Sequence, residues 1–386
     1  MKFLLSSLSF VLLAALSSHA SLNRGVWFWG DAGSPWGSIA IVGDSAKEDS
    51  TVTFLNNKGV KRVYGSYQNR PVSVPGTIAN WNVKLHTADI ESQCLFSDNG
   101  MIFPSTRWAL LDKIEERVMY FNFWPTPRPT AERFDAIHLD LEPQALSAWD
   151  TATASEKRDM LMDLRDTYEA IRLLVVAWGY PGFPIYADLA TWFDKNPGQI
   201  GWLDDADRDQ WYADIMTHLT GVTYMAFEQP SIVAVQNSMS WEHANIANEQ
   251  IRIGHMADVG TTWATVAHFS MMMYSMEWVY GSRAVDIQSY RRWREALFLG
   301  IPAVPISVEP ALGGSGGGSD GDGEIVWMAG TKGSYAVMES TDLVHWAELR
   351  RVDVQQPGRM RTPFVISGPR KFWQVLQISE SQERER

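Results

Sequence analysis

Short apolar segments alternate with longer amphipathic stretches through most of the chain, and this alternation constrains the fold more than any other feature. It is typical of repeated βα units and a parallel sheet. Eight such units within about 290 of the 386 residues match a (β/α)8 barrel, which needs about 250. The predicted strands are Gly25–Trp29, Lys61–Tyr67, Ser92–Asp98, Ala136–Pro143, Pro184–Ala190, Gly221–Gln229, Thr265–Met273 and Ile301–Glu309.

The predicted helices fill the intervals between these strands. An open doubly wound sheet is the alternative α/β fold, but no G-x-G-x-x-G turn follows the first strand, and polar residues gather late in several strands. We therefore expect a TIM barrel. The predicted helices are Thr106–Met119, Ser155–Val175 with Ser155 as its cap, Asp205–Leu219, Trp241–Met256 and Asp286–Leu299.

Composition shifts divide the chain into segments. Residues 1–20, MKFLLSSLSFVLLAALSSHA, have a basic start, a short apolar stretch and small residues at the end, which predicts a signal peptide and a secreted or periplasmic protein. No later stretch reaches the ~18 apolar residues of a membrane span. We expect the barrel at 21–312, a Gly/Ser/Asp linker at 313–323, a small all-β sandwich at 324–379 and a polar tail at 380–386.

Composition also limits the partners and cofactors. A net charge of −12 argues against nucleic acid, whose binding depends on Lys and Arg. Eighteen tryptophans exceed what a core usually needs, and indole rings stack on sugar rings, so a carbohydrate is the expected partner. The single cysteine, Cys94, excludes an internal disulfide and a zinc site of cysteines. We expect no cofactor, and the sequence predicts no oligomeric state.

The segment FDAIHLDLEP, Phe134–Pro143, carries a polar residue at every second position. In a strand, His138, Asp140 and Glu142 share one face and the leucines and isoleucine the other. Burying these groups without partners would cost several kcal/mol, so their face must open onto a cavity, a metal or a substrate. An exposed edge strand is the alternative. In a barrel, Glu142 would stand at the carboxyl end of its strand, where barrel enzymes place their chemistry.

These carboxylates suit glycosidic bond hydrolysis, which needs one protonated acid and a second group as nucleophile, base or electrostatic support. We expect Glu142 to be the acid, with Asp140 roughly 6 to 7 Å away along the strand and raising its pKa. Glu228, after the sixth strand, is a second carboxylate across the mouth. Asp188, within the fifth strand, and Glu309, closing the last strand, are further candidates. For Glu228, Asp188 and Glu309 alike, a structural salt bridge is the alternative role. His138 is expected to hydrogen-bond Asp140.

The same segment resembles the fourth-strand signature of chitinase-like glycoside hydrolases (family eighteen), Asp-Gly-x-Asp-x-Asp-x-Glu. Asp135 matches the first Asp, Asp140 the third and Glu142 the catalytic acid, whereas His138 replaces the second Asp. The segment YMAFEQ resembles the sixth-strand Met-x-Tyr-Asp of that family, with Phe227 in place of Tyr and Glu228 in place of Asp. The resemblance implies that Glu142 is the acid and that Asp140 orients the N-acetyl group of the substrate. The tyrosine hydroxyl that helps this aspartate in the family is absent here, because Phe227 replaces the tyrosine.

Two other functions stay open. A barrel that has lost catalysis could bind glycans or a partner. A metal-dependent phosphodiesterase could use His138, Asp140, Glu142 and Glu228 as ligands, but the second histidine near the first strand is missing, so no metal is expected. Aromatic residues at strand ends favour a sugar cleft, and the expected substrate-binding residues are Trp27, Trp29, Tyr67, Tyr224, Trp192 and Trp278.

The C-terminal segment carries a second resemblance. SYAVMESTDLVHW, Ser334–Trp346, followed by Lys371, Phe372 and Trp373, is similar to a phrase in small β modules of exported bacterial proteins. The resemblance implies attachment, sorting or sugar binding.

Overall fold

The computed structural model describes residues 22–31, 33–195, 200–227, 229–259, 262–263, 266–280 and 285–299, and six C-terminal strands between residues 306 and 378. The chain divides into two compact units, Met1–Ala296 and Leu297–Arg386. The predicted signal peptide, most of the predicted linker and the polar tail lie outside the described residues.

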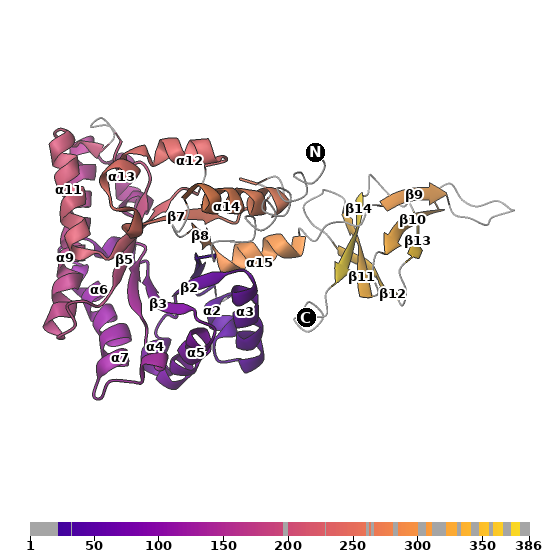
Figure 1. Ribbon diagram of the computed structural model, residues 1–386, viewed down its shortest axis with the longest axis horizontal. Helices are drawn as coiled ribbons and strands as arrows, with labels where there is room; N and C mark the ends of the chain where they lie inside the picture. Colours follow the sequence, from indigo (N-terminus) through magenta and orange to yellow (C-terminus); the bar gives the residue numbers. More distant parts are fainter. Residues whose placement is uncertain are drawn as a thin grey trace, which may run out of the picture. The chain divides into compact units, whose positions relative to one another are not determined.

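The first unit is a closed barrel of eight parallel strands in sequence order, which is the predicted TIM-barrel architecture. Figure 1 shows the helices packed around these strands. Four of the six strands predicted before residue 230 overlap observed ones closely, whereas the fourth and the sixth are shorter than predicted. The strands are β1 (Arg24–Phe28), β2 (Val60–Gly65), β3 (Glu91–Phe96), β4 (Ala136–Leu139), β5 (Ile185–Ala190), β6 (Gly221–Met225), β7 (Ile251–Met256) and β8 (Val285–Gln288).

The last two predicted barrel strands were wrong. Thr265–Met273 falls largely in helix α14 (Val266–Tyr280), whose buried Phe269, Met272, Met273 and Met276 recur at helical spacing. A short apolar run fits a strand or a buried helix equally well, which explains the error. The true seventh strand lies inside the predicted helix Trp241–Met256, and the true eighth strand at the start of the predicted helix Asp286–Leu299.

The helices otherwise follow the predicted intervals. The longest, α9, begins after Thr153 rather than Ser155, because the Thr153 side chain accepts a hydrogen bond from the backbone of Glu156 in a capping box. The helices are α2 (Ser38–Ile41), α3 (Ser45–Asn57), α4 (Arg70–Ser73), α5 (Pro75–Thr87), α6 (Arg107–Ile114), α7 (Phe121–Phe123), α8 (Ser147–Thr151), α9 (Ala154–Ala177), α11 (Asp205–His218), α12 (Ile232–Ser238), α13 (Ser240–Asn245), α14 and α15 (Tyr290–Leu299). Among the described residues, no helix is both long and apolar enough to cross a membrane.

The second unit contains two three-stranded antiparallel sheets, coloured orange to yellow in Figure 1. One has the order β13-β10-β9 and the other β12-β11-β14. Their packing into a sandwich stays a prediction. The segment predicted as the eighth barrel strand ends in β9, which pairs with β10, so Glu309 belongs to this unit. The strands are β9 (Ile306–Pro310), β10 (Asp322–Ala329), β11 (Gly333–Ser340), β12 (Ala347–Val354), β13 (Gly358–Val365) and β14 (Phe372–Ile378).

The two faces of the barrel strands differ in polarity. The residues that face the helices, such as Val26, Val63, Ile137 and Leu139, are apolar and buried. The residues that face the barrel axis alternate with them and include His138, which is also fully buried. The interior of the barrel therefore holds polar and charged groups away from bulk water.

Candidate active site

The polar row of β4 continues beyond the end of the strand. The ladder stops at Leu139, but the Asp140 N–H still donates to the Phe96 carbonyl at 2.8 Å, which keeps the chain extended for one more residue. The Glu142 N–H donates to the side chain of Asn99 at 2.9 Å, and a short 3₁₀ turn begins at Pro143. Asp140 and Glu142 therefore leave β4 at its carboxyl end, the face predicted from the sequence.

Asp140 is a buried carboxyl group with little compensation. It is only 6% exposed, and its Oδ1 has no hydrogen-bond partner among the described residues. Burial raises the pKa of Asp140 well above its ordinary value, and a negative charge on Asp188 or on Glu142 raises it further. No basic side chain in the described part of the chain forms a salt bridge with it. Such a group has the environment of a catalytic carboxyl.

Glu142 is half-buried beside Asp140. Burial raises the pKa of Glu142, and the hydrogen bond that the Gln144 amide donates to Oε2 at 2.8 Å offsets part of this effect. The Glu142 side chain thus keeps a proton at a higher pH than an ordinary glutamate while its residue stays partly open to solvent. Both properties are those of a proton donor.

His138 does not have the partner expected from the sequence. Its Nε2 lies 2.9 and 3.0 Å from the two Asp188 oxygens, and its Nδ1 lies 2.8 Å from Gln93 Oε1, so the predicted bond to Asp140 was wrong. Tyr64 stacks on the imidazole with a centroid distance of 3.9 Å. Burial lowers the pKa of His138 to about 3, and the positive charge of Arg252 adds to this effect.

Asp188, a further predicted candidate carboxylate from the fifth strand, lies in the barrel interior. It is 1% exposed, and its Oδ2 accepts a hydrogen bond from the Trp27 indole at 2.9 Å. Burial raises the pKa of Asp188 well above its ordinary value, although the Trp27 bond opposes this shift. Asp188 thus contacts His138 directly, and its ionisation would act on the pKa of Asp140.

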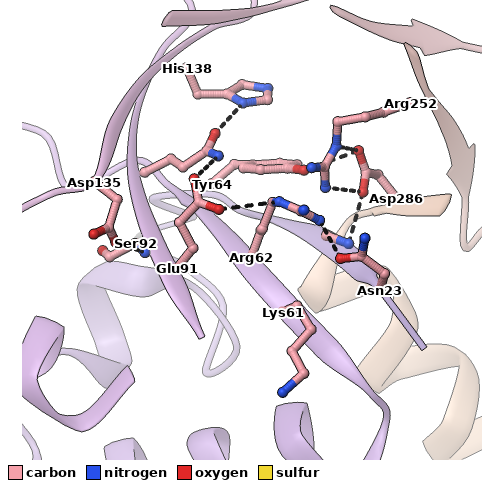
Figure 2. Close-up of polar contacts among 12 residues, drawn as sticks. Asn23, Lys61, Arg62, Tyr64, Glu91, Ser92, Asp135, His138, Arg252 and Asp286 are labelled. Carbon is pink, nitrogen blue, oxygen red and sulfur yellow. Dashed lines mark hydrogen bonds and ion pairs between the residues drawn. The ribbon is translucent and has the colours of Figure 1, made fainter. Parts of the chain in front are cut away.

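A chain of polar contacts runs from His138 toward the amino ends of the strands. The Gln93 amide donates to Glu91 Oε1 at 2.7 Å, and Arg62 contacts Glu91 Oε2 at 3.2 Å and donates to Asn23 at 2.6 Å. Figure 2 shows His138, Glu91, Arg62 and Asn23 along this chain. Arg62 and Asn23 also line a cavity of about 610 Å³ at this end of the barrel, opposite Glu142.

The barrel interior holds a second charged group, which the sequence-based prediction does not include. Arg252 makes two hydrogen bonds to Asp286, at 2.8 and 2.7 Å, and Tyr64 donates to the same carboxylate at 3.0 Å (Figure 2). Burial alone would raise the pKa of Asp286, but the Arg252 guanidinium holds it below its ordinary value. Gly25 donates its N–H to Asp286 at 2.8 Å, and a Cβ at this position would overlap Tyr64 and Asp286.

The sequence signal for this group was the alternation in IRIGHM and VDIQ, where Arg252 and Asp286 occupy inward positions of β7 and β8. Both segments fall largely in predicted helices, so the alternation does not identify them as strands.

The aromatic residues predicted to line the mouth have different surroundings. Trp27 is buried in the interior, and Trp29 and Phe227 pack against the cluster that Trp27 forms with Tyr64 and Leu95. Trp192 follows β5, is half-buried and meets Trp149 edge to face at 5.9 Å. Trp192 and Trp29, which directly follows β1, are both predicted sugar-stacking residues that keep partial exposure just beyond a strand end.

Two further predicted aromatic residues, Tyr67 and Tyr224, do not reach the mouth as expected. Tyr67 is 1% exposed, stacks on Phe134 and accepts a hydrogen bond from the Trp81 indole at 2.8 Å, so it belongs to the core. Tyr224 is fully buried on the helix-facing side of β6. Trp278 lies in α14 rather than after a strand, and its side chain lies outside the described residues, as does Glu228.

Metal ligands do not gather in the described part of the chain. No group of three or more His, Cys, Asp or Glu side chains there could hold a metal ion. His138, Asp140 and Glu142 share a face, but His138 uses both ring nitrogens for Gln93 and Asp188.

Comparison with known proteins gives likeness in fold only. No protein-family model matches the sequence, and the curated proteins contain no match. A chitinase of glycoside hydrolase family 18 from Pseudoalteromonas aurantia is 11% identical, with 72% of this chain and 100% of that chain covered and a TM-score of 0.44. A glucosidase from Croceicoccus marinus is 9% identical, with 93% and 96% covered and a TM-score of 0.43. A sugar phosphate isomerase/epimerase from Parabacteroides distasonis is 7% identical, with 72% and 97% covered and a TM-score of 0.42. Such distant similarities carry no argument about activity.

Proposed function

We propose that the protein is an exported glycoside hydrolase that cleaves a polysaccharide or oligosaccharide, with Glu142 as the proton donor. The observation that carries this proposal is the pair of carboxyl groups, Asp140 and Glu142, at the carboxyl end of β4. Both have a raised pKa, and neither forms a salt bridge within the described residues. A barrel of this kind places its chemistry at that face.

The pair can divide the two tasks of hydrolysis. Glu142 is the more exposed of the two, so it can reach a glycosidic oxygen and protonate it as the bond breaks. Because the two charges repel each other, one proton shared across the pair is favoured over two ionised groups. Asp140, once ionised, then stabilises the positive charge that develops on the sugar ring or orients a substrate group that attacks the ring carbon.

Trp192 supports the same substrate class. Its partly exposed ring beyond β5, held by Trp149 and Phe193, offers a flat apolar surface for a sugar ring. Export through residues 1–20 and a sugar-binding or sorting role of residues 324–379 complete the proposal.

Hydrolysis of a glycan panel by the mature protein tests the proposal, with Glu142→Gln as the decisive variant. The amide keeps the size of the side chain but cannot donate an acidic proton, so turnover should fall about 10³-fold or more while ligand affinity stays. Asp150→Asn, an exposed carboxylate in α8, is the matched control and should keep full turnover.

Two results would reject the assignment. Binding of glycans without hydrolysis, unchanged by Glu142→Gln, would indicate a barrel that binds sugars without cleaving them. Loss of activity on a phosphodiester after treatment with a chelator would indicate the metal-dependent alternative.

A further inference from the structure

The direction of the hydrogen bonds in the barrel interior is fixed at Glu91. Its carboxylate can only accept, and it receives the Gln93 amide at 2.7 Å and faces Arg62 at 3.2 Å. Because the Gln93 NH₂ group is turned to Glu91, its Oε1 is turned to His138. An amide oxygen accepts and never donates, so His138 Nδ1 must carry a hydrogen.

With the hydrogen on Nδ1, the contact between His138 Nε2 and Asp188 lacks a donor. A neutral histidine has one N–H, which Gln93 already uses, so Nε2 presents a lone pair. Both oxygens of Asp188 lie within 3.0 Å of this nitrogen. An ionised carboxylate would place its own lone pairs against that of Nε2. One proton must therefore lie between His138 and Asp188.

We infer that this proton belongs to Asp188, which is a neutral carboxylic acid donating to Nε2 of a neutral His138. Neither side chain has any measurable exposure, and a buried ion pair would lose the hydration of both charges. The guanidinium of Arg252 is engaged with Asp286 and repels a charged imidazole. Trp27 donates to the second Asp188 oxygen, which suits the carbonyl oxygen of an acid.

The neutral pair has a consequence for the proposed function, on which this step rests. Asp188 lies close enough to raise the pKa of Asp140 when it is charged. If Asp188 is neutral, Asp140 faces only the charge of Glu142, and the two can share one proton as hydrolysis requires. His138 and Asp188 are thus positioning residues that set the number of charges at the mouth.

Nitrogen-15 NMR of His138 in the full-length mature protein tests the inference without requiring activity. We expect one protonated nitrogen, Nδ1, and one unprotonated nitrogen, Nε2, at every pH from 5 to 8. A His138→Gln sample assigns the signals. A doubly protonated ring, or a proton on Nε2 alone, would overturn the inference even if the protein proves to be a hydrolase.

Two substitutions of Asp188 add a second readout. In Asp188→Asn the amide can donate to Nε2 and accept from Trp27, as the acid does, so the His138 signals should be kept and turnover should stay within about tenfold. Asp188→Leu can do neither, and turnover should fall more than 100-fold with altered His138 signals. If Asn and Leu are equally damaging to both readouts, Asp188 acts as an ionised carboxylate and the inference fails. If no glycan is cleaved by any variant, the proposed function fails while the NMR result still decides the proton position.

Discussion

The two ends of the barrel interior differ in whether their buried carboxyl groups are paired with basic side chains. Toward the amino ends of the strands, Glu91 and Asp286 each face a guanidinium, from Arg62 and Arg252. At the carboxyl end, Asp140 and Glu142 meet no basic side chain among the described residues, and the Asp140 Oδ1 has no hydrogen-bond partner there. The same barrel strands therefore carry paired carboxylates at one end and carboxyl groups without a described basic partner at the other.

This difference separates structural charge from functional charge. A buried carboxylate that is paired and fully hydrogen-bonded holds strands together, and removing one partner is costly. A buried carboxylate without compensation destabilises the fold and is retained where chemistry needs a raised pKa. The pKa directions follow, since that of Asp286 is lowered and that of Asp140 is raised.

Removing the cation at the amino end should have the largest effect on stability. Arg252→Met leaves Asp286 charged and unpaired in the interior, and we expect the free energy of unfolding to fall by about 3–5 kcal/mol. Urea denaturation measures this loss. Adding Asp286→Leu in the same chain should recover part of it, because no lone charge then remains. A loss below about 1 kcal/mol for Arg252→Met would show that the pair is not structural.

Neutralising Asp140 at the carboxyl end should raise the free energy of unfolding rather than lower it. The folded protein keeps the Asp140 proton at pH values where the unfolded chain, with a pKa of about 3.9, has lost it. This contribution to stability is complete below about pH 4 and is lost as the pH rises through the folded pKa. Asp140→Asn should therefore match the wild type near pH 4 and exceed it at pH 8 by about 1–3 kcal/mol, while losing turnover.

Thermal unfolding at both pH values measures the Asp140 effect, and Asp150→Asn is again the matched control. A variant that is less stable than the wild type at pH 8 would mean that an unrecognised partner compensates Asp140, and the contrast between the two ends would break down.

The smallest effect is expected at the rim. Trp192→Ala, made in the Glu142→Gln chain so that the ligand stays intact, should weaken oligosaccharide binding by about 5- to 10-fold, or about 1–1.4 kcal/mol. Calorimetry gives the dissociation constant. Trp124, 63% exposed in the segment before β4, provides the control substitution to alanine, which should leave affinity unchanged. Equal losses in both variants would remove Trp192 from the proposed cleft.

The amount predictable from the sequence varied between strands. The polar row of β4 was recognised because apolar and polar residues alternate through His138, and Asp140 and Glu142 leave that strand at its carboxyl end, as predicted. β7 and β8 were missed because both fall largely in predicted helices, Trp241–Met256 and Asp286–Leu299, so Arg252 and Asp286 were not considered. Tyr67 is predicted at the mouth because it ends its predicted strand, and Tyr224 is predicted there as an aromatic residue of the sixth strand. Sequence position does not show that Tyr67 turns into the core or that Tyr224 faces the helices.

The sequence by itself determined the barrel and the face on which the carboxylates emerge, because local alternation of apolar and polar residues sets both. Only the tertiary structure decided which groups meet inside. His138 bonds to Asp188 and Gln93 from neighbouring strands rather than to Asp140 on its own strand, since parallel strands bring side chains 45 and 50 residues apart into hydrogen-bond distance. Contacts between strands depend on register and barrel closure, which no local pattern in the chain contains.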